Sequence, residues 1–153
     1  MTVKSRIWRS IVAGACGSIV HFIFMYLKSR TNLLPLFQPY QSFQTTLAHW
    51  VGTNVPAIVP WILSFLNGMT ILGFLFARSN RMLPGKSGAA KGVIFGLIGW
   101  VIMGLIIFPA IGLGPFAIGV GSGLGPALLS LVMLQVYSIV LGTVYGLLDA
   151  SSQ

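Results

Sequence analysis

Four long apolar stretches alternate with more polar connections along the chain. They cover about residues 7–27, 55–77, 89–111 and 126–148. Each is long enough to cross ~30 Å of hydrocarbon as a helix, and the apolar residues run continuously instead of alternating as in a membrane β-barrel. A single segment in lipid satisfies its own backbone hydrogen bonds only as a helix. The pattern therefore predicts an all-α membrane protein with four transmembrane helices.

Composition agrees with this assignment and excludes two classes of function. Of the 153 residues, 56% are hydrophobic and 7% are charged, whereas a soluble domain has roughly 25% charged residues. The net charge of +8 arises because one acid, Asp149, faces nine Lys and Arg. This balance reflects missing acids instead of a basic patch. We therefore exclude a soluble enzyme, expect no nucleic-acid partner, and expect residues 1–153 to form one integral membrane domain.

The basic residues are divided unequally between the two sides of the predicted bundle. Seven of the nine share one side if both termini are cytoplasmic: Lys4, Arg6, Arg9, Arg78, Arg81, Lys86 and Lys91. Cytoplasmic segments carry the excess of Lys and Arg, so we expect both termini in the cytoplasm. In the connection between helices two and three, Arg78, Arg81 and Lys86 are expected to contact anionic lipid headgroups.

Two connections have patterns of their own. Between the first two stretches, Phe43, Leu47 and Trp50 fall on one helical face. This predicts a short helix at the membrane interface, anchored by Trp50. The connection at residues 112–125 is rich in glycine and has no charge. We expect a loose outer turn there, with a re-entrant segment or a docking surface for a partner as alternatives.

Small residues recur at four-residue spacing within the predicted helices. In lipid, this spacing lets two helix backbones approach closely and recover van der Waals contact. The sequence therefore predicts a glycine-rich four-helix bundle, with another subunit as the alternative partner of some stripes. The predicted packing residues are Gly14, Gly17, Gly88, Gly92, Gly96, Gly142 and Gly146.

Two amides interrupt the apolar stretches near their middles. Asn67 lies in the second stretch and Gln135 in the fourth. A hydrogen bond between them would join two helices at ~1 kcal/mol. The alternative is contact with a substrate or ion, since intramembrane polar residues mark such sites. At the end of the fourth stretch, Asp149 is expected to neutralise Arg9, Arg78 or Arg81.

Few side chains remain for chemistry. Both histidines are expected on the side opposite Asp149, no carboxylates form a pair, and Cys16 is the single cysteine. These residues make neither a catalytic triad nor a thiolate metal site, so we predict that the protein is not an enzyme and has no cofactor. The alternative is haem b or a metal ion between His21 and His49, because neutral imidazole is a common ligand.

Three stretches of sequence resemble a known family. They are GVIFGLIGW at 92–100, FPAIGLGPF at 108–116 and YSIVLGTVYG at 137–146, and the Ala13-Gly14 pair of the first helix is similar too. The pattern resembles a group of small, uncharacterised bacterial inner-membrane proteins with four helices, a domain of unknown function. The resemblance implies four helices in a bacterial inner membrane. It implies no reaction and no catalytic residues.

The sequence leaves three functional hypotheses. The first is a non-catalytic accessory or structural subunit of a larger membrane complex, respiratory or photosynthetic, whose partners are lipids and other membrane subunits. The second is a small oligomeric channel or transporter with Asn67 and Gln135 along its path. The third is an electron-transfer subunit with haem between His21 and His49. We prefer the first because it requires the fewest chemical groups.

Overall fold

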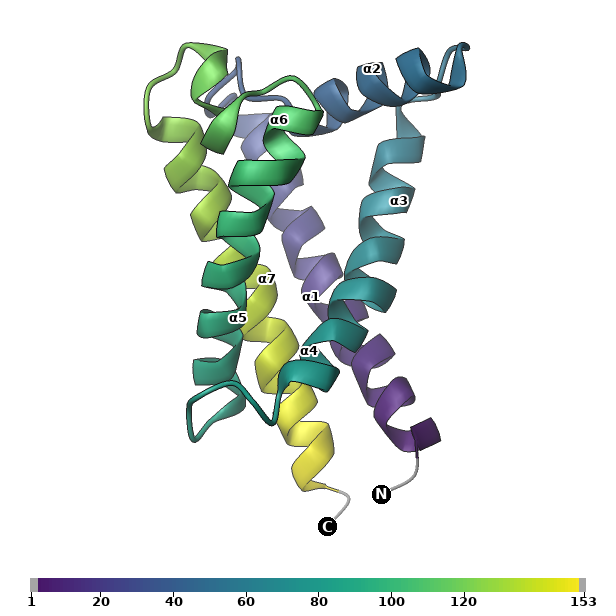
Figure 1. The fold of residues 1–153 in the computed structure, drawn as a ribbon, viewed down its shortest axis with the longest axis vertical. Helices are drawn as coiled ribbons and strands as arrows, with labels where there is room; N and C mark the ends of the chain where they lie inside the picture. The colour runs from purple at the N-terminus through teal and green to yellow at the C-terminus, as the bar shows by residue number, and fades with distance from the viewer. Residues whose placement is uncertain (1–2, 152–153) are drawn as a thin grey trace.

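The computed structural model describes residues 3–151, and these form a bundle of helices without a strand (Figure 1). Four helical segments are long and apolar enough to cross a membrane: Ser5–Thr31, Ile58–Ser79, Gly88–Ala110 and Gly125–Ala150. The prediction of an all-α, multi-pass membrane protein is confirmed. The observed spans differ from the predicted stretches only by a few residues at their ends.

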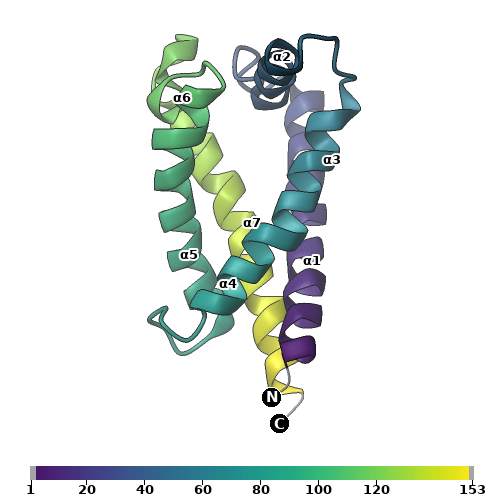
Figure 2. The same ribbon diagram turned by 45° about the vertical axis from the view of Figure 1, so that its right-hand side comes forward.

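The elements follow one another in this order: α1 Val3–Thr31, α2 Pro39–Val51, α3 Ile58–Asn67, η1 Gly68–Leu72, α4 Gly73–Ser79, α5 Gly88–Ile102, η2 Met103–Ile107, α6 Phe108–Ala110, η3 Pro115–Val120 and α7 Gly125–Ala150. Helix α7 packs along both α5 and α1, while the second span packs mainly against α1. The second span runs obliquely, so that α4 crosses α7 in the half of the bundle that holds the chain termini (Figure 2). Both termini lie at this end, and α2 lies across the other (Figure 1).

Two spans contain a π-helical turn that the apolar pattern did not predict. These turns are η1 in the second span and η2 in the third. A π turn adds a residue to the helix and shifts its hydrogen bonds. Each turn contains a buried glycine that faces an aromatic ring: Gly68 faces Tyr137, and Gly104 faces Phe116. In both spans the irregular turn is thus the place where a ring from elsewhere in the chain packs.

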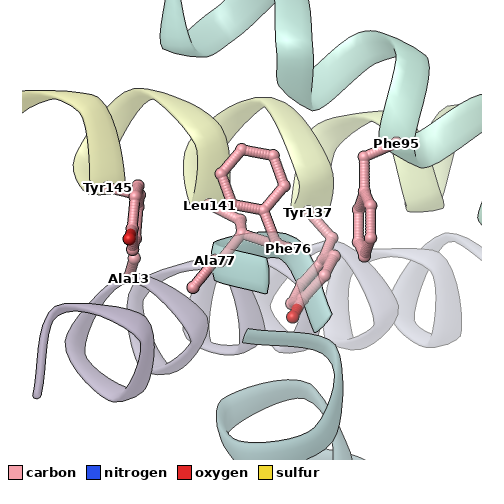
Figure 3. Close-up of a cluster of buried hydrophobic side chains, with 7 residues drawn as sticks. All are labelled: Ala13, Phe76, Ala77, Phe95, Tyr137, Leu141 and Tyr145. Atoms are coloured by element: carbon pink, nitrogen blue, oxygen red, sulfur yellow. The ribbon is translucent and has the colours of Figure 1, made fainter. Parts of the chain in front are cut away.

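The main core lies where all four spans meet, towards the termini. Phe76 is at its centre, and its ring meets those of Phe95 and Tyr145 edge-on at centroid distances of 5.3 and 5.7 Å. Such edge-to-face pairs are favourable beyond the area that they bury. The buried members come from α1, α4, α5 and α7 (Figure 3): Ala13, Phe76, Ala77, Phe95, Tyr137, Leu141 and Tyr145.

A second, smaller core closes the opposite end. It joins Phe37 to Phe108, Leu113 and Ala117. Ala117 has no exposed surface, and the neighbouring Phe116 ring packs on Trp100 at 4.7 Å. The expectation of a loose outer turn at 112–125 is therefore wrong, because Leu113, Phe116 and Ala117 of this connection pack against the end of the bundle.

The predicted short helix between the first two spans is present as α2. None of its residues is buried, and Trp50 is 67% exposed. The side chain of Gln44 donates from Nε2 to the Val55 carbonyl at 2.7 Å, which ties α2 to the start of the second span. Gly52, with φ of 74°, ends the helix in the left-handed conformation that glycine allows.

Candidate functional site

The glycines of α5 lie against α7 at backbone distance. A Cβ added at Gly88 would collide with the carbonyl of Gly142, and one at Gly92 with the carbonyl of Ser138. One turn further along, Gly96 lies against the Ser138 side chain. Any side chain at these positions would separate the two helices, so this face of α5 is occupied within the chain. It is not open to another subunit.

The glycines of α1 contact two different elements. Gly14 lies against the backbone of Gly68 and Met69 in η1, and Gly17 lies against the ring of Tyr137. The Tyr137 hydroxyl crosses from α7 and donates to the Gly68 carbonyl at 2.6 Å. The π turn, α1 and α7 therefore meet at a single buried point in the middle of the bundle.

The two intramembrane amides do not meet. Gln135 donates from Nε2 to the Val93 carbonyl of α5 at 3.3 Å, and its buried Oε1 has no hydrogen-bond partner within residues 3–151. Asn67 is exposed, at the end of α3. The predicted Asn67–Gln135 contact is wrong because the second span presents Asn67 to the outside of the bundle instead of to α7.

The two histidines have different surroundings. The His21 ring lies edge-on to Tyr137 at 6.5 Å and close to Phe22 at 6.3 Å. Its buried Nδ1 has no hydrogen-bond partner in the described part of the chain. His49 is exposed in the last turn of α2. Haem or metal binding between them remains a prediction, which the Soret absorbance of the purified protein would test.

The single acid is paired at the terminal end of the bundle. Arg9 donates from Nη1 to Oδ1 of Asp149 at 2.6 Å, which links α1 to α7. Arg9 is 8% exposed, so its charge is withdrawn from solvent. Nearby, Arg6 donates from Nη2 to the Ala77 carbonyl of α4 at 3.2 Å. Of the arginines expected to be neutralised by Asp149, Arg9 is the partner.

Three further basic side chains at this end point outwards. Arg78, Arg81 and Lys86 are exposed in and after α4. Arg78 also lines a cavity of about 170 Å³ together with Arg6. Contact with lipid headgroups stays a prediction for these three residues, and their exposure leaves them accessible for it.

A larger cavity opens at the opposite end, between α1, α2 and α3. Its volume is about 280 Å³, and its lining residues are Met25, Lys28, Ser29, Gln38, Tyr40, Gln41, Gln44, Ala57 and Trp61. The Tyr40 and Trp61 rings lie 4.3 Å apart. Burial raises the pKa of Tyr40, whose hydroxyl shares a 3.1 Å hydrogen bond with Ser64, so this hydroxyl stays protonated at neutral pH.

A comparison with known protein families identifies the family of this chain. A model described as a family of unknown function, DUF6789, matches residues 4–153. The chain belongs to the DUF6789 family. This confirms the resemblance to an uncharacterised family that the glycine-rich stretches indicated. No curated protein and no solved structure matches the chain, so for this DUF6789 protein the function is argued from its own residues.

The cavity of this DUF6789 protein was not predicted from the sequence. The first apolar stretch ends at about residue 27, and this boundary leaves Lys28 in the connection that follows. Helix α1 extends to Thr31, so Lys28 lies inside the helix and is 5% exposed. The available signal was its spacing from Met25, the residue one turn earlier, which is also buried. Positions three apart share a helical face. Continuing the first helix by one turn would therefore have placed Met25 and Lys28 together on the face that packs into the bundle.

Proposed function

We propose that this DUF6789 protein is a non-catalytic structural subunit of a larger membrane assembly, held to a transmembrane helix of a partner through Asn67. The supporting observation is the environment of that amide. Asn67 lies near the middle of the span Ile58–Ser79 and is exposed, and its side chain makes no hydrogen bond within residues 3–151. Moving an amide into hydrocarbon without a hydrogen bond costs roughly 4–8 kcal/mol on the cyclohexane scale.

Two exposed threonines in the spans are satisfied by their own helix. Thr70 donates to the Leu66 carbonyl at 2.6 Å, and Thr143 donates to the Ile139 carbonyl at 2.7 Å. Asn67 differs because its amide faces outwards among apolar side chains, including Leu66 and Ile71. A polar group on a neighbouring transmembrane helix would satisfy the amide, as such groups do across helix interfaces.

The assembly that we propose is a heteromeric complex of a bacterial inner membrane, respiratory or photosynthetic. The family resemblance supports the membrane. The chain has one acidic side chain, two histidines and one cysteine, and so few groups for acid–base or nucleophilic chemistry support a role without catalysis. The channel hypothesis needs Asn67 and Gln135 on one path. It receives no support from an arrangement in which Gln135 bonds to α5 and Asn67 faces outwards.

Asn67→Leu is the variant that tests this role. We expect native mass spectrometry of the gently solubilised wild-type particle to show additional polypeptides in fixed ratio, and the variant to lose them. Thr70→Val is the matched control, because it also removes an exposed polar group of this span but one bonded internally. A wild-type particle containing only this chain, or an Asn67→Leu particle of unchanged composition, would contradict the proposal.

We further propose that both termini face the cytoplasm. The termini and the α4–α5 connection lie at one end of the bundle (Figure 1), and seven of the nine basic residues belong to these segments. The test introduces single cysteines into a variant of the protein in which Cys16 is replaced. In whole cells, an impermeant maleimide should label Gln41→Cys, on the outer side, and leave Lys86→Cys, on the cytoplasmic side, unlabelled. The reverse labelling pattern would show the opposite orientation.

A further inference from the structure

The end of α1 carries a cation that is withdrawn from solvent. Lys28 is 5% exposed. Its ammonium donates to the Phe37 carbonyl and lies over the Phe37 ring, 5.4 Å from the centroid. An ammonium has three N–H donors, and the carbonyl accepts only one of them. The neutral contacts hold the side chain in place, but they do not balance its charge.

No acidic side chain of this chain lies beside that charge. The sequence contains one acidic side chain, Asp149. It lies at the terminal end of the bundle in an ion pair with Arg9. A buried charge is costly unless it is paired. Since Asp149 is already paired at the other end, an anion from outside the chain is the natural counter-ion for the Lys28 ammonium.

The cavity beside Lys28 has room for such an anion. Its volume of about 280 Å³ is near the lower limit of small-molecule sites, ~300 Å³. This suits a headgroup better than a whole lipid. Gln38 and Gln44 both line the cavity and each donates its side-chain nitrogen to a backbone carbonyl, which leaves the amide oxygens as acceptors for hydroxyl groups.

The surroundings of the cavity match the border of a membrane. The cavity is lined by residues at the end of α1, in and just before α2, and at the start of the second span. These elements meet at the end of the bundle that α2 covers (Figure 2). The stacked pair Tyr40 and Trp61 forms one wall, and Phe22 meets Trp61 edge-on at 5.3 Å. Aromatic rings of this kind are enriched at the level of lipid headgroups. An amphiphile could place its headgroup in the cavity and leave its chains in the bilayer.

We propose that this cavity binds the phosphate of an anionic phospholipid headgroup, with Lys28 as the cation that it contacts and the glutamines as acceptors for headgroup hydroxyls. Phosphatidylglycerol has both features, a net negative phosphate and free hydroxyls. The inference does not depend on the subunit role, because it concerns the end of the second span where α3 begins, whereas Asn67 lies near the middle of that span.

The test uses the full chain in detergent with short-chain phosphatidylglycerol or phosphatidylcholine, and native mass spectrometry to count bound lipid. We expect the wild type to prefer phosphatidylglycerol, and Lys28→Gln to bind it about tenfold more weakly, as for loss of a hydrogen bond to a charged group. Arg30→Gln is the matched control. Arg30 is two residues from Lys28, and its side chain is exposed. The control removes one positive charge there, and the variant should still prefer phosphatidylglycerol.

A second variant keeps the test decisive if Lys28→Gln fails to fold. Ala57 is exposed and lines the cavity, so Ala57→Trp should fill it without touching Lys28 and should abolish the preference. Inorganic phosphate is then added as a competitor. Displacement of the lipid by phosphate would assign the site to a soluble phosphate, and no displacement would assign it to the lipid. Equal binding of both lipids by the wild type, or a preference unchanged in Ala57→Trp, would overturn the proposal.

Discussion

Gly92→Ala is expected to destabilise the bundle by about 3 kcal/mol, the upper part of the range for overpacking. The new Cβ would lie 2.9 Å from the carbonyl carbon of Ser138 and 3.1 Å from the Cα of Ile139. Both atoms belong to the backbone of α7, which cannot rotate away as a side chain would. Thermal unfolding in detergent, followed by the reaction of Cys16 with a thiol-specific dye, measures the effect.

Gly99→Ala is the matched control in the same helix. Its Cβ would meet only the Leu134 side chain, at 3.4 Å, an ordinary contact distance. Alanine is favoured over glycine inside a helix by roughly 0.5–1 kcal/mol, so this variant should be as stable as the wild type or more stable. Equal unfolding temperatures for the two variants would show that α5 and α7 are not packed at backbone distance.

Asp149→Asn is expected to cost about 2–3 kcal/mol, because it leaves Arg9 buried without its carboxylate. Breaking one partner of a buried pair costs ~3–5 kcal/mol, and the effect is smaller here since the Asp149 side chain is 33% exposed. Unfolding of the detergent-solubilised variant by the same thiol-dye assay measures it. The exposed Arg81 provides the control, and Arg81→Gln should leave the unfolding temperature unchanged.

The double variant Arg9→Gln with Asp149→Asn separates pairing from other effects. If the ion pair carries the loss, the double variant should be more stable than Asp149→Asn alone, because no unpaired charge remains buried. A double variant whose loss equals the sum of the two single losses would show that Arg9 and Asp149 act independently.

The spans were predictable from the sequence because the bilayer restricts a long apolar segment to one conformation. The rotation of each span about its own axis was not predictable from the sequence. The face that Asn67 presents depends on the extra residue of η1, and this turn is stabilised by the Tyr137 hydroxyl and by the close approach of Gly14. Contacts between residues so far apart leave no periodic signal in the second span itself.

For the candidate sites too, part was predictable from the sequence and part depended on contacts between distant residues. The pairing of Asp149 could be narrowed to three arginines by counting charges, and the geometry of α1 then selects Arg9. The packed connection at 112–125 could not be foreseen, because Phe116 and Ala117 adopt left-handed backbone conformations, with φ of 50° and 58°. Such conformations are uncommon outside glycine, and here the contact of the Phe116 ring with Trp100 accompanies them.

The Arg9–Asp149 pair also imposes an order on biosynthesis. The two residues are 140 positions apart, and a ribosome adding ~5–20 residues per second makes Asp149 roughly seven to thirty seconds after Arg9. During that interval Arg9 has no acidic side chain of the same chain to meet. Arg9 must remain among headgroups and water until the fourth helix arrives, so the closure of this end of the bundle is a late step of assembly.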